Sequence, residues 1–566
     1  MPSLSYCLFR SRVVRQPHWW AANVLALAAF CGAQDIGYAA TPAAAPMAPA
    51  VACQKLSGLT IAAGAIGEPT SGASVGSAEL IAADAPKNIN GEYCKVLGAI
   101  HPVDRSAPDI NFEVNLPSNW NHKTLQFGGG GLNGVLVSGL GYYNRQPEAE
   151  ATPLKQGYVT MGSDSGHQSA IAFDGKFYLN AEALENYGHQ QIKKTHDVAL
   201  QLVQARYGGK PEHNYFIGAS QGGHEGFDAV QRYPNDYDGV VAGYPAHNVV
   251  MLHLAAWNYA KALQGEGGKS WINPAKAKAL VAMVYERCDG LDGAKDGIIS
   301  NVRACEAHNA SLKLLTKQNP IRCAGGADTG NDCLSDAQIS ALNAIDKPYE
   351  VGFPLFADDK GSAAFPKWTP FAGSTFRDGG IDILGTDGPT KALQYAPGVA
   401  TLGLAIAQDP NLDVYKNFDP KAYAARIKDL AQRISANSID LDQFKKRGGK
   451  LIMYHGLADD FISPYSSIQY YGRLKSRYDA ASLGEFVKFY TIPGMGHVTG
   501  VFGARMSSLE TLEKWVEHGV APGTLLATDA NKETQGRTRP VCQYPAWPHY
   551  RGKGDINSAQ SFSCRT

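Results

Sequence analysis

The most informative stretch of this chain reads YFIGASQGG, from Tyr215 to Gly223. Its first three residues are apolar and predict a buried strand, and the residues that follow the glycines predict a helix. Between them, Gly218 to Gly222 matches G-x-S-x-G, in which small residues permit a sharp strand-to-helix turn that exposes a serine. The chain contains 61 glycines, so the motif alone carries little weight and the flanking elements support it. We therefore expect Ser220 to be a nucleophile.

Other apolar runs also end in glycine-containing turns. Residues 125–127 lead into four glycines at 128–131, residues 451–454 end at His455-Gly456, and residues 486–492 end at Pro493-Gly494. Helical spacing of apolar residues appears at 192–203 and at 509–516. Strands that end in loops and alternate with helices indicate a mostly parallel sheet covered by helices. The predicted fold class is α/β, of the α/β-hydrolase type.

A serine hydroxyl needs a base within hydrogen-bond reach, and in this fold the acid and the histidine follow the serine in the chain. His497 ends the glycine turn after residues 486–492, so it is the predicted general base. Three alternatives remain, and they are His455, His224 and His167.

The predicted acid lies in the loop after residues 451–454. Asp459 is preferred to its neighbour Asp460, because two adjacent acids in an extended loop point in different directions. The oxyanion of the reaction needs two N–H donors. We expect one from Gln221 and the second from Gly130 or Gly131, because glycine permits close approach of the backbone. No G-K-[ST] follows this glycine run, which argues against a phosphate-binding loop.

The chain has 566 residues, more than one compact core needs. The alternation of predicted strands and helices is not recognisable over residues 246–440. This segment is therefore predicted to be an inserted lid domain between two parts of the hydrolase core, residues 53–245 and 441–566. Lysine plus arginine and aspartate plus glutamate both number 52. A neutral chain has no overall field to attract nucleic acid, so no nucleic-acid partner is expected.

The first forty residues resemble a secretory signal peptide. Basic residues precede an apolar run at 19–30 that is too short to span a bilayer, and small residues near Ala39 and Ala40 suit a signal peptidase. We expect residues 1–40 to be removed, residues 41–52 to form a tail without structure, and the protein to be exported, periplasmic or secreted, without a stable membrane anchor.

Export makes disulfides the expected state of the cysteines. Eight of the ten lie outside the signal segment, and eight cysteines permit 105 connectivities. Their positions favour four local pairs, namely Cys53 with Cys94, Cys288 with Cys305, Cys323 with Cys333, and Cys542 with Cys564.

One loop carries three aspartates among glycines. Asp289, Asp292 and Asp296 are spaced at i, i+3 and i+7, and hard oxygen ligands on a tight loop suit Ca²⁺. The carbonyls of Ala294 and Ile298 would complete the shell. We expect a structural calcium ion here, the alternative being a solvated acidic turn.

Together these motifs resemble the tannase and feruloyl esterase family. The resemblance covers nearly the whole mature chain and includes residues 127–131, 163–167, 218–223, 233–239, 289–298, 455–464 and 494–497. It implies a hydrolase core with a large lid, the same structural calcium site, and hydrolysis of phenolic or other aromatic carboxylic esters. Family members typically join the residue before the serine to the residue after the histidine by a disulfide. Here those positions hold Ala219 and Val498, so we expect packing of two small apolar side chains to replace the bond.

The predicted function is therefore a secreted serine ester hydrolase that acts on small feruloyl, galloyl or terephthalate monoester substrates. The alternatives are a peptidase or lipase-like hydrolase of the same fold, and a catalytically silent binding protein.

Overall fold

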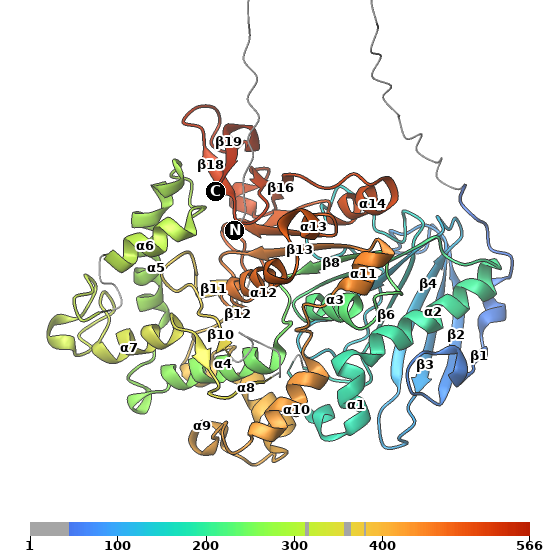
Figure 1. Cartoon of the computed structure of the whole chain (residues 1–566), viewed down its shortest axis with the longest axis horizontal. Helices are drawn as coiled ribbons and strands as arrows, with labels where there is room; N and C mark the ends of the chain where they lie inside the picture. Colours follow the sequence, from blue (N-terminus) through green and yellow to red (C-terminus); the bar gives the residue numbers. More distant parts are fainter. Residues whose placement is uncertain (1–44, 172, 312–315, 356–363, 379–380) are drawn as a thin grey trace, which may run out of the picture. The chain divides into compact units, whose positions relative to one another are not determined.

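The computed structural model describes residues 45–566 except 172, 312–315, 356–363 and 379–380. Its main feature is a ten-stranded sheet in the order β1-β2-β3-β4-β6-β5-β7-β8-β13-β14. The first four strands are antiparallel, and the strands from β6 to β14 run parallel to one another. Figure 1 shows the antiparallel strands in blue at one side of the sheet. The α/β-hydrolase fold predicted from the sequence is confirmed.

The strands of this sheet have the following bounds: β1 (Thr60–Ile61), β2 (Gly72–Ile81), β3 (Tyr93–His101), β4 (Ile110–Pro117), β5 (Lys123–Phe127), β6 (Val159–Ser163), β7 (His213–Ala219), β8 (Gly239–Gly243), β13 (Lys450–Gly456) and β14 (Val487–Ile492). All four strands expected from the apolar runs are present, as β5, β7, β13 and β14. The antiparallel strands β1 to β4 were not anticipated.

Alternation along β7 explains how the sheet is covered on both faces. Tyr215 and Ile217 belong to a core that includes α14 (Ser508–His518), whereas Phe216 between them belongs to a core with α3 (Gln221–Gln231) and α12 (Pro464–Arg477). Successive side chains of a strand point to opposite faces, so each face acquires its own apolar layer. A third core joins α2 (Gln191–Tyr207) to the antiparallel strands. The helices expected at 192–203 and 509–516 are therefore present and packed on the sheet.

The segment predicted as a lid is mainly helical. Its helices are α4 (Val249–Leu263), α5 (Pro274–Cys288), α6 (Val302–Ser311), α7 (Asp336–Ile345), α8 (Tyr395–Val399), a π-helix (Ala400–Ala407), α9 (Val414–Asn417) and α10 (Ala424–Ile434). All of them except α8 contribute to one large apolar core, which also includes Tyr178 and Ile462 from outside the segment. This shared core ties the segment to the loops around Ser220.

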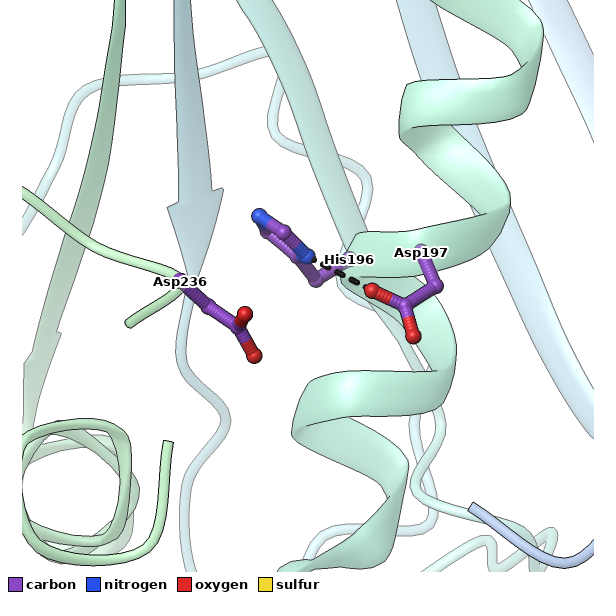
Figure 2. Close-up of side chains that lie close together, drawn as sticks. All are labelled: His196, Asp197 and Asp236. Atoms are coloured by element: carbon purple, nitrogen blue, oxygen red, sulfur yellow. Dashed lines mark hydrogen bonds and ion pairs between the residues drawn. The ribbon is translucent and has the colours of Figure 1, made fainter. Parts of the chain in front are cut away.

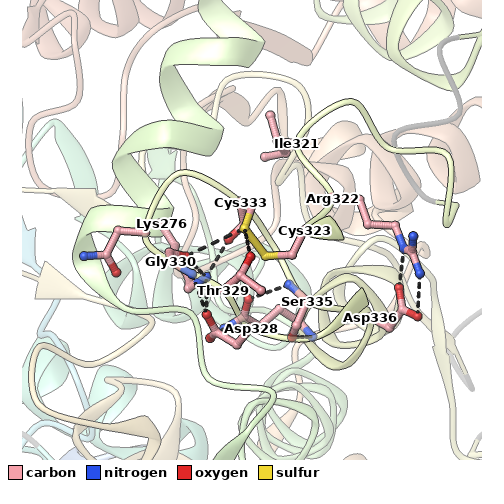
Figure 3. Close-up of a disulfide and its surroundings, with 12 residues drawn as sticks. Lys276, Ile321, Arg322, Cys323, Asp328, Thr329, Gly330, Cys333, Ser335 and Asp336 are labelled. Atoms are coloured by element: carbon pink, nitrogen blue, oxygen red, sulfur yellow. Dashed lines mark hydrogen bonds and ion pairs between the residues drawn. A yellow bond between two sulfur atoms is a disulfide. The ribbon is translucent and has the colours of Figure 1, made fainter. Parts of the chain in front are cut away.

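All four predicted disulfides are confirmed. Figure 3 shows the Cys323–Cys333 bond inside the predicted lid, where the loop that it closes is fastened to α5. The buried Lys276 of α5 donates to the Gly330 carbonyl at 2.6 Å and pairs with Asp328 at 3.1 Å. The Cys542–Cys564 bond joins the C-terminal hairpin of β18 (Trp547–Tyr550) and β19 (Phe562–Arg565) to the end of β17 (Thr538–Val541).

The expectation of an unstructured tail at 41–52 is wrong for its described part. Met47 pairs with Trp120 in a short antiparallel bridge, with N–H to carbonyl distances of 2.7 and 3.1 Å. The N–H groups of Ala50 and Val51 both donate to the Arg206 carbonyl. These backbone bonds anchor the segment to the core despite its alanine and proline composition. The predicted signal peptide, residues 1–40, lies outside the described residues.

Candidate active site

Ser220 occupies the turn between β7 and α3 in a strained conformation. Its φ and ψ are 60° and −119°, a region that non-glycine residues enter at a cost of about 1–3 kcal/mol. The neighbouring glycines make the turn possible, because a Cβ on Gly218 would lie 2.3 Å from the Gly222 carbonyl oxygen. The Ser220 N–H donates to the Gly243 carbonyl of β8 at 3.0 Å, which ties the turn to the sheet. The geometry is that of a serine presented at the tip of a strand.

The structure brings His497 and Asp459 to this serine. His497 Nε2 lies 3.1 Å from Ser220 Oγ, and His497 Nδ1 lies 2.9 Å from Asp459 Oδ2. Asp459 is fully buried, and its Oδ1 accepts the N–H groups of Phe461 and Ile462 at 3.0 and 2.9 Å. The three side chains thus form one hydrogen-bonded chain across the ends of β7, β13 and β14.

The surroundings of Asp459 keep it ionised. Burial by itself raises the pKa of this carboxyl, but the nearby His497 and His455 outweigh burial and hold the pKa below its ordinary value. A permanent carboxylate can fix the His497 tautomer with the proton on Nδ1, which leaves Nε2 free to accept a proton from serine. The neighbouring Asp460 instead accepts from Ser374 Oγ at 3.3 Å.

The other candidate histidines make different contacts. His455 lies 2.8 Å from Ser467 Oγ and 3.1 Å from the Ile462 carbonyl. His224 faces Asp228 of the same helix at 2.9 Å. His167 stacks on Phe177, and burial lowers its pKa to about 4. Within the described part of the chain, no hydrogen bond links the imidazole of any of the three to Ser220, and the His224 contact with Ser220 is a backbone one, from its N–H to the Ser220 carbonyl.

The predicted oxyanion donors lie beside the serine. Gln221 is the first residue of α3, where a helix N–H has no partner inside the helix, and the helix dipole favours a negative charge. Gly131 lines the same hollow as Ser220 and has a φ of 61°. The glycine loop is docked on α3, because the Gly222 N–H donates to the Gly129 carbonyl at 3.1 Å and the Gly129 N–H donates to Glu225 at 2.8 Å.

Glu225 also contacts the glycine loop, although it was not among the site residues predicted from the sequence. It is fully buried, and besides Gly129 it accepts from Asn133 Nδ2 at 2.6 Å. Burial raises the pKa of this carboxyl to about 7, although both donors oppose the shift. The sequence signal that could have indicated Glu225 is a glutamate at the fifth position of the helix that follows the nucleophile serine.

Arg145 supports the His497 loop in a way the sequence did not indicate. Its buried guanidinium donates to the carbonyls of Gly496 and His497 at 3.2 and 3.1 Å. Val498, expected to pack on Ala219, keeps 40% of its surface exposed, and this packing stays a prediction. The hydrogen bonds from Arg145 support the same loop.

The hollow at Ser220 is largely apolar. The aromatic rings of Phe173 and Phe461 line it, and they make an edge-to-face contact with 6.1 Å between the ring centroids. The Phe461 ring also contacts the His497 ring, with 5.1 Å between the centroids. The full set of lining residues is Gly131, Phe173, Ser220, Gln221, Ala246, Val249, Leu252, His253, Gln394, Pro397, Phe461 and Ile462. The lining residues outside the predicted motifs were not anticipated, because they come from distant loops, from α4 and from α8.

The predicted calcium loop follows α5 and is bracketed by the Cys288–Cys305 disulfide. Its donor set of carboxylate and carbonyl oxygens suits a hard divalent cation. Burial, together with the nearby Asp296, raises the pKa of Asp292 to about 6. In the structure the carboxylates accept N–H groups of their own loop, and Asp296 pairs with Arg539. The three carboxylates do not gather within 4.8 Å of one another.

A different cluster does meet that distance in the described ranges, and Figure 2 shows it. His196 Nδ1 lies 3.0 Å from Asp197 Oδ1, and Asp236 lies opposite. The Lys193 ammonium already bridges the two carboxylates, at 3.1 Å from Asp197 and 3.0 Å from Asp236. This cluster is therefore an ion-pair network that fastens the turn after α3 to α2.

The fold and the serine at a strand-to-helix turn define an α/β-hydrolase. A model of the family described as tannase and feruloyl esterase matches residues 94–565. The chain belongs to this family and is a carboxylic ester hydrolase. The expected resemblance is confirmed.

Individual relatives agree with this assignment. An uncharacterized esterase of Agrobacterium fabrum is 38% identical over 531 residues, covering 92% of this chain and 94% of the relative. The mono(2-hydroxyethyl) terephthalate hydrolase of Piscinibacter sakaiensis is 30% identical, with 84% and 85% covered. The crystal structure of feruloyl esterase B from Aspergillus oryzae superposes with a TM-score of 0.71 at 26% identity, covering 87% of this chain and 97% of that one. Within residues 45–566, no helix among those described combines the length and apolarity of a membrane span.

Proposed function

We propose that the protein hydrolyses aromatic carboxylic esters through Ser220, His497 and Asp459. The observation that carries this proposal is the continuous hydrogen-bonded chain from Ser220 Oγ through both nitrogens of His497 to Asp459. A chain of this kind lets one imidazole accept the serine proton and later return it.

In the proposed mechanism, Ser220 Oγ attacks the ester carbonyl while His497 Nε2 accepts its proton. The N–H groups of Gln221 and of Gly131, with Gly130 as the alternative donor, stabilise the oxyanion. His497 then protonates the leaving alcohol, and an acyl-enzyme remains on the serine. A water molecule that His497 deprotonates releases the acid and restores the hydroxyl.

The aromatic character of the substrate is supported by the hollow and by the relatives. Phe173 and Phe461 offer aromatic edges and faces to an acyl ring. Relatives named feruloyl esterase and mono(2-hydroxyethyl) terephthalate hydrolase act, by those names, on esters of aromatic acids. A small aromatic ester is thus the expected partner.

Two further features belong to this proposal. Calcium would be held by Asp289, Asp292, Asp296 and the carbonyls of Ala294 and Ile298, and it would stabilise this loop without taking part in the reaction. Export to the periplasm or the medium follows from the leader-like start of the sequence, and the four disulfides agree with an oxidising compartment.

Active-site labelling tests the proposal directly. A fluorophosphonate should label the wild type and the surface control Ser476→Ala but not Ser220→Ala, with the adduct mapped to Ser220 by mass spectrometry. The two labelled proteins should hydrolyse methyl ferulate or methyl gallate faster than a peptide amide. An unlabelled wild type, or a Ser220→Ala variant with full esterase activity, would refute the assignment.

A further inference from the structure

The two glycines expected to supply the second oxyanion donor make no hydrogen bond with their own N–H groups. Among the described residues, neither the Gly130 N–H nor the Gly131 N–H donates to any acceptor, and a Cβ on Gly130 would meet nothing within 4 Å. Free N–H groups of this kind are available to a developing oxyanion, but their positions depend on the residues on either side of them. The neighbours that decide these positions are Gly129 and Asn133.

One carboxylate, that of Glu225, binds both of these neighbours. Its Oε2 accepts the Gly129 N–H at 2.8 Å, and its Oε1 accepts Asn133 Nδ2 at 2.6 Å. The Asn133 N–H donates to the Gly130 carbonyl at 2.8 Å and closes a turn that contains Gly131. Glu225 is 1% exposed and Asn133 is 5% exposed, so bulk water does not compete for these bonds. Glu225 therefore holds the loop on both sides of the glycine pair.

Glu225 also ties this loop to the helix that carries the first donor. Gly222 and Glu225 are three positions apart in α3, so they lie on the same face of the helix. The Gly222 N–H donates to the Gly129 carbonyl at 3.1 Å, and a Cβ on Gly222 would lie 2.9 Å from that carbonyl oxygen. Since Gln221 begins the same helix, the two bonds at Gly129 fix the distance between the Gln221 donor and the Gly131 donor.

We infer that Glu225 is a positioning residue for the reaction, which sets the separation of the two oxyanion donors through its bonds to Gly129 and Asn133. Glu225 is not one of the residues that line the hollow, so it acts without touching the substrate. The inference rests on the proposed function, because it assumes that the Gln221 and Gly131 N–H groups bind the oxyanion. A displacement of a catalytic group by about 1 Å can lower the rate by about 10²-fold, and this loss appears in the transition state rather than in substrate binding.

Glutamine can replace the carboxylate in this arrangement. Its Oε1 can accept the Gly129 N–H, and its Nε2 can donate to Asn133 once the Asn133 amide turns over and presents its oxygen. The Ser165 hydroxyl, which lies 2.7 Å from Asn133 Nδ2, can then donate to that oxygen instead. Methionine has a similar size but no comparable acceptor, so it leaves the Gly129 N–H unpaired.

Steady-state kinetics of two Glu225 variants test the inference. With p-nitrophenyl acetate, Glu225→Met should lower kcat by about 30-fold to 300-fold while KM stays within about threefold of the wild type. Glu225→Gln should rescue the rate and retain at least about a fifth of wild-type kcat. The matched control is Glu113→Met, which removes another buried glutamate, in β4, and should keep the wild-type kcat even if its melting temperature falls.

An aryl trifluoromethyl ketone gives a readout of the oxyanion donors themselves. Ser220 Oγ bonds to the ketone carbon, His497 takes the serine proton, and the former carbonyl oxygen becomes an oxyanion that resembles the transition state. For Glu225→Met, the Ki of this ketone should rise by the same factor as kcat/KM falls. Asn133→Gly removes the other bond of Glu225 at a position with a φ of 61°, which glycine adopts freely, and it should show the same proportionality with about a 10-fold loss.

The outcomes separate this inference from the proposed function. If the wild type has no esterase activity and a fluorophosphonate does not label Ser220, the proposed function fails. If the wild type is active through Ser220 but Glu225→Met keeps kcat within about threefold, the inference is overturned and the proposed function stands. The inference is also overturned if Glu225→Met loses kcat but binds the ketone as tightly as the wild type, or if Glu113→Met loses as much. If Glu225→Met does not fold, the kinetics and ketone binding of Asn133→Gly decide in the same way.

Discussion

Replacing Asp459 by asparagine changes the one atom of this side chain that faces His497. Oδ1 is held by the N–H groups of Phe461 and Ile462 at 3.0 and 2.9 Å, so the asparagine oxygen must stay there. The amide nitrogen then takes the place of Oδ2 and points its hydrogens at His497 Nδ1, which lies 2.9 Å from Oδ2 in the wild type. Two donors cannot face each other, so His497 must carry its proton on Nε2 instead.

A proton on Nε2 faces Ser220 Oγ and prevents the imidazole from accepting the serine proton. We expect kcat to fall by about 10⁴-fold, equivalent to about 5.5 kcal/mol of transition-state stabilisation, while KM changes little. The change keeps the size of the side chain and its two backbone bonds, so the free energy of unfolding should be affected far less than the rate.

The assay is the steady-state hydrolysis of p-nitrophenyl acetate together with the rate of fluorophosphonate labelling of Ser220. The matched control is Asp460→Asn, whose carboxylate faces Ser374, and it should keep kcat within about tenfold of the wild type. An Asp459→Asn enzyme with more than a tenth of wild-type kcat would refute the tautomer argument. A larger loss in Asp460→Asn would move the acid to the neighbouring residue.

Three further results are expected. Burial raises the pKa of Glu225 to about 7, so the folded wild type must ionise a buried acid as pH rises. In urea unfolding, the free energy of unfolding of the wild type should therefore fall by about 3 kcal/mol relative to that of Glu225→Gln between pH 4 and pH 8. A difference that does not vary with pH would contradict this. Arg145→Met should lower kcat about 10-fold to 100-fold with little change in KM, since the His497 loop loses two hydrogen bonds, and an unchanged kcat would show that the loop needs no such support. Chelation of calcium should lower the melting temperature by about 5 °C, with recovery on adding Ca²⁺ but not Mg²⁺, whereas equal melting curves would argue for an acidic turn without an ion.

Much of the core could be predicted because its signals are local. The signal for a strand that ends in a glycine turn lies in adjacent residues, as at Tyr215 to Gly222. The order of Ser220, Asp459 and His497 along the chain also matched the order in the sheet of the strands that carry them. The four disulfides were also local pairs, with separations of 41, 17, 10 and 22 residues.

Local pattern was a poor guide where pairing is non-local. The four antiparallel strands at the start of the sheet were missed, and Met47 was expected in a free tail although it pairs with Trp120, 73 positions away by their numbers. The composition of an alanine- and proline-rich segment does not indicate with which distant backbone segment it will pair.

The sequence by itself determined the nucleophile turn, the candidate acid and base, and the local cysteine pairs, because each depends on residues within one strand and its loop. Only the tertiary structure decided which groups surround them. Arg145 binds Gly496 in the His497 loop, 351 positions away in the sequence, and Gln394 binds Phe461, 67 positions away. Neither contact therefore has a signature in neighbouring residues. Such contacts arise when separate strands and helices are packed together, and packing depends on the whole chain.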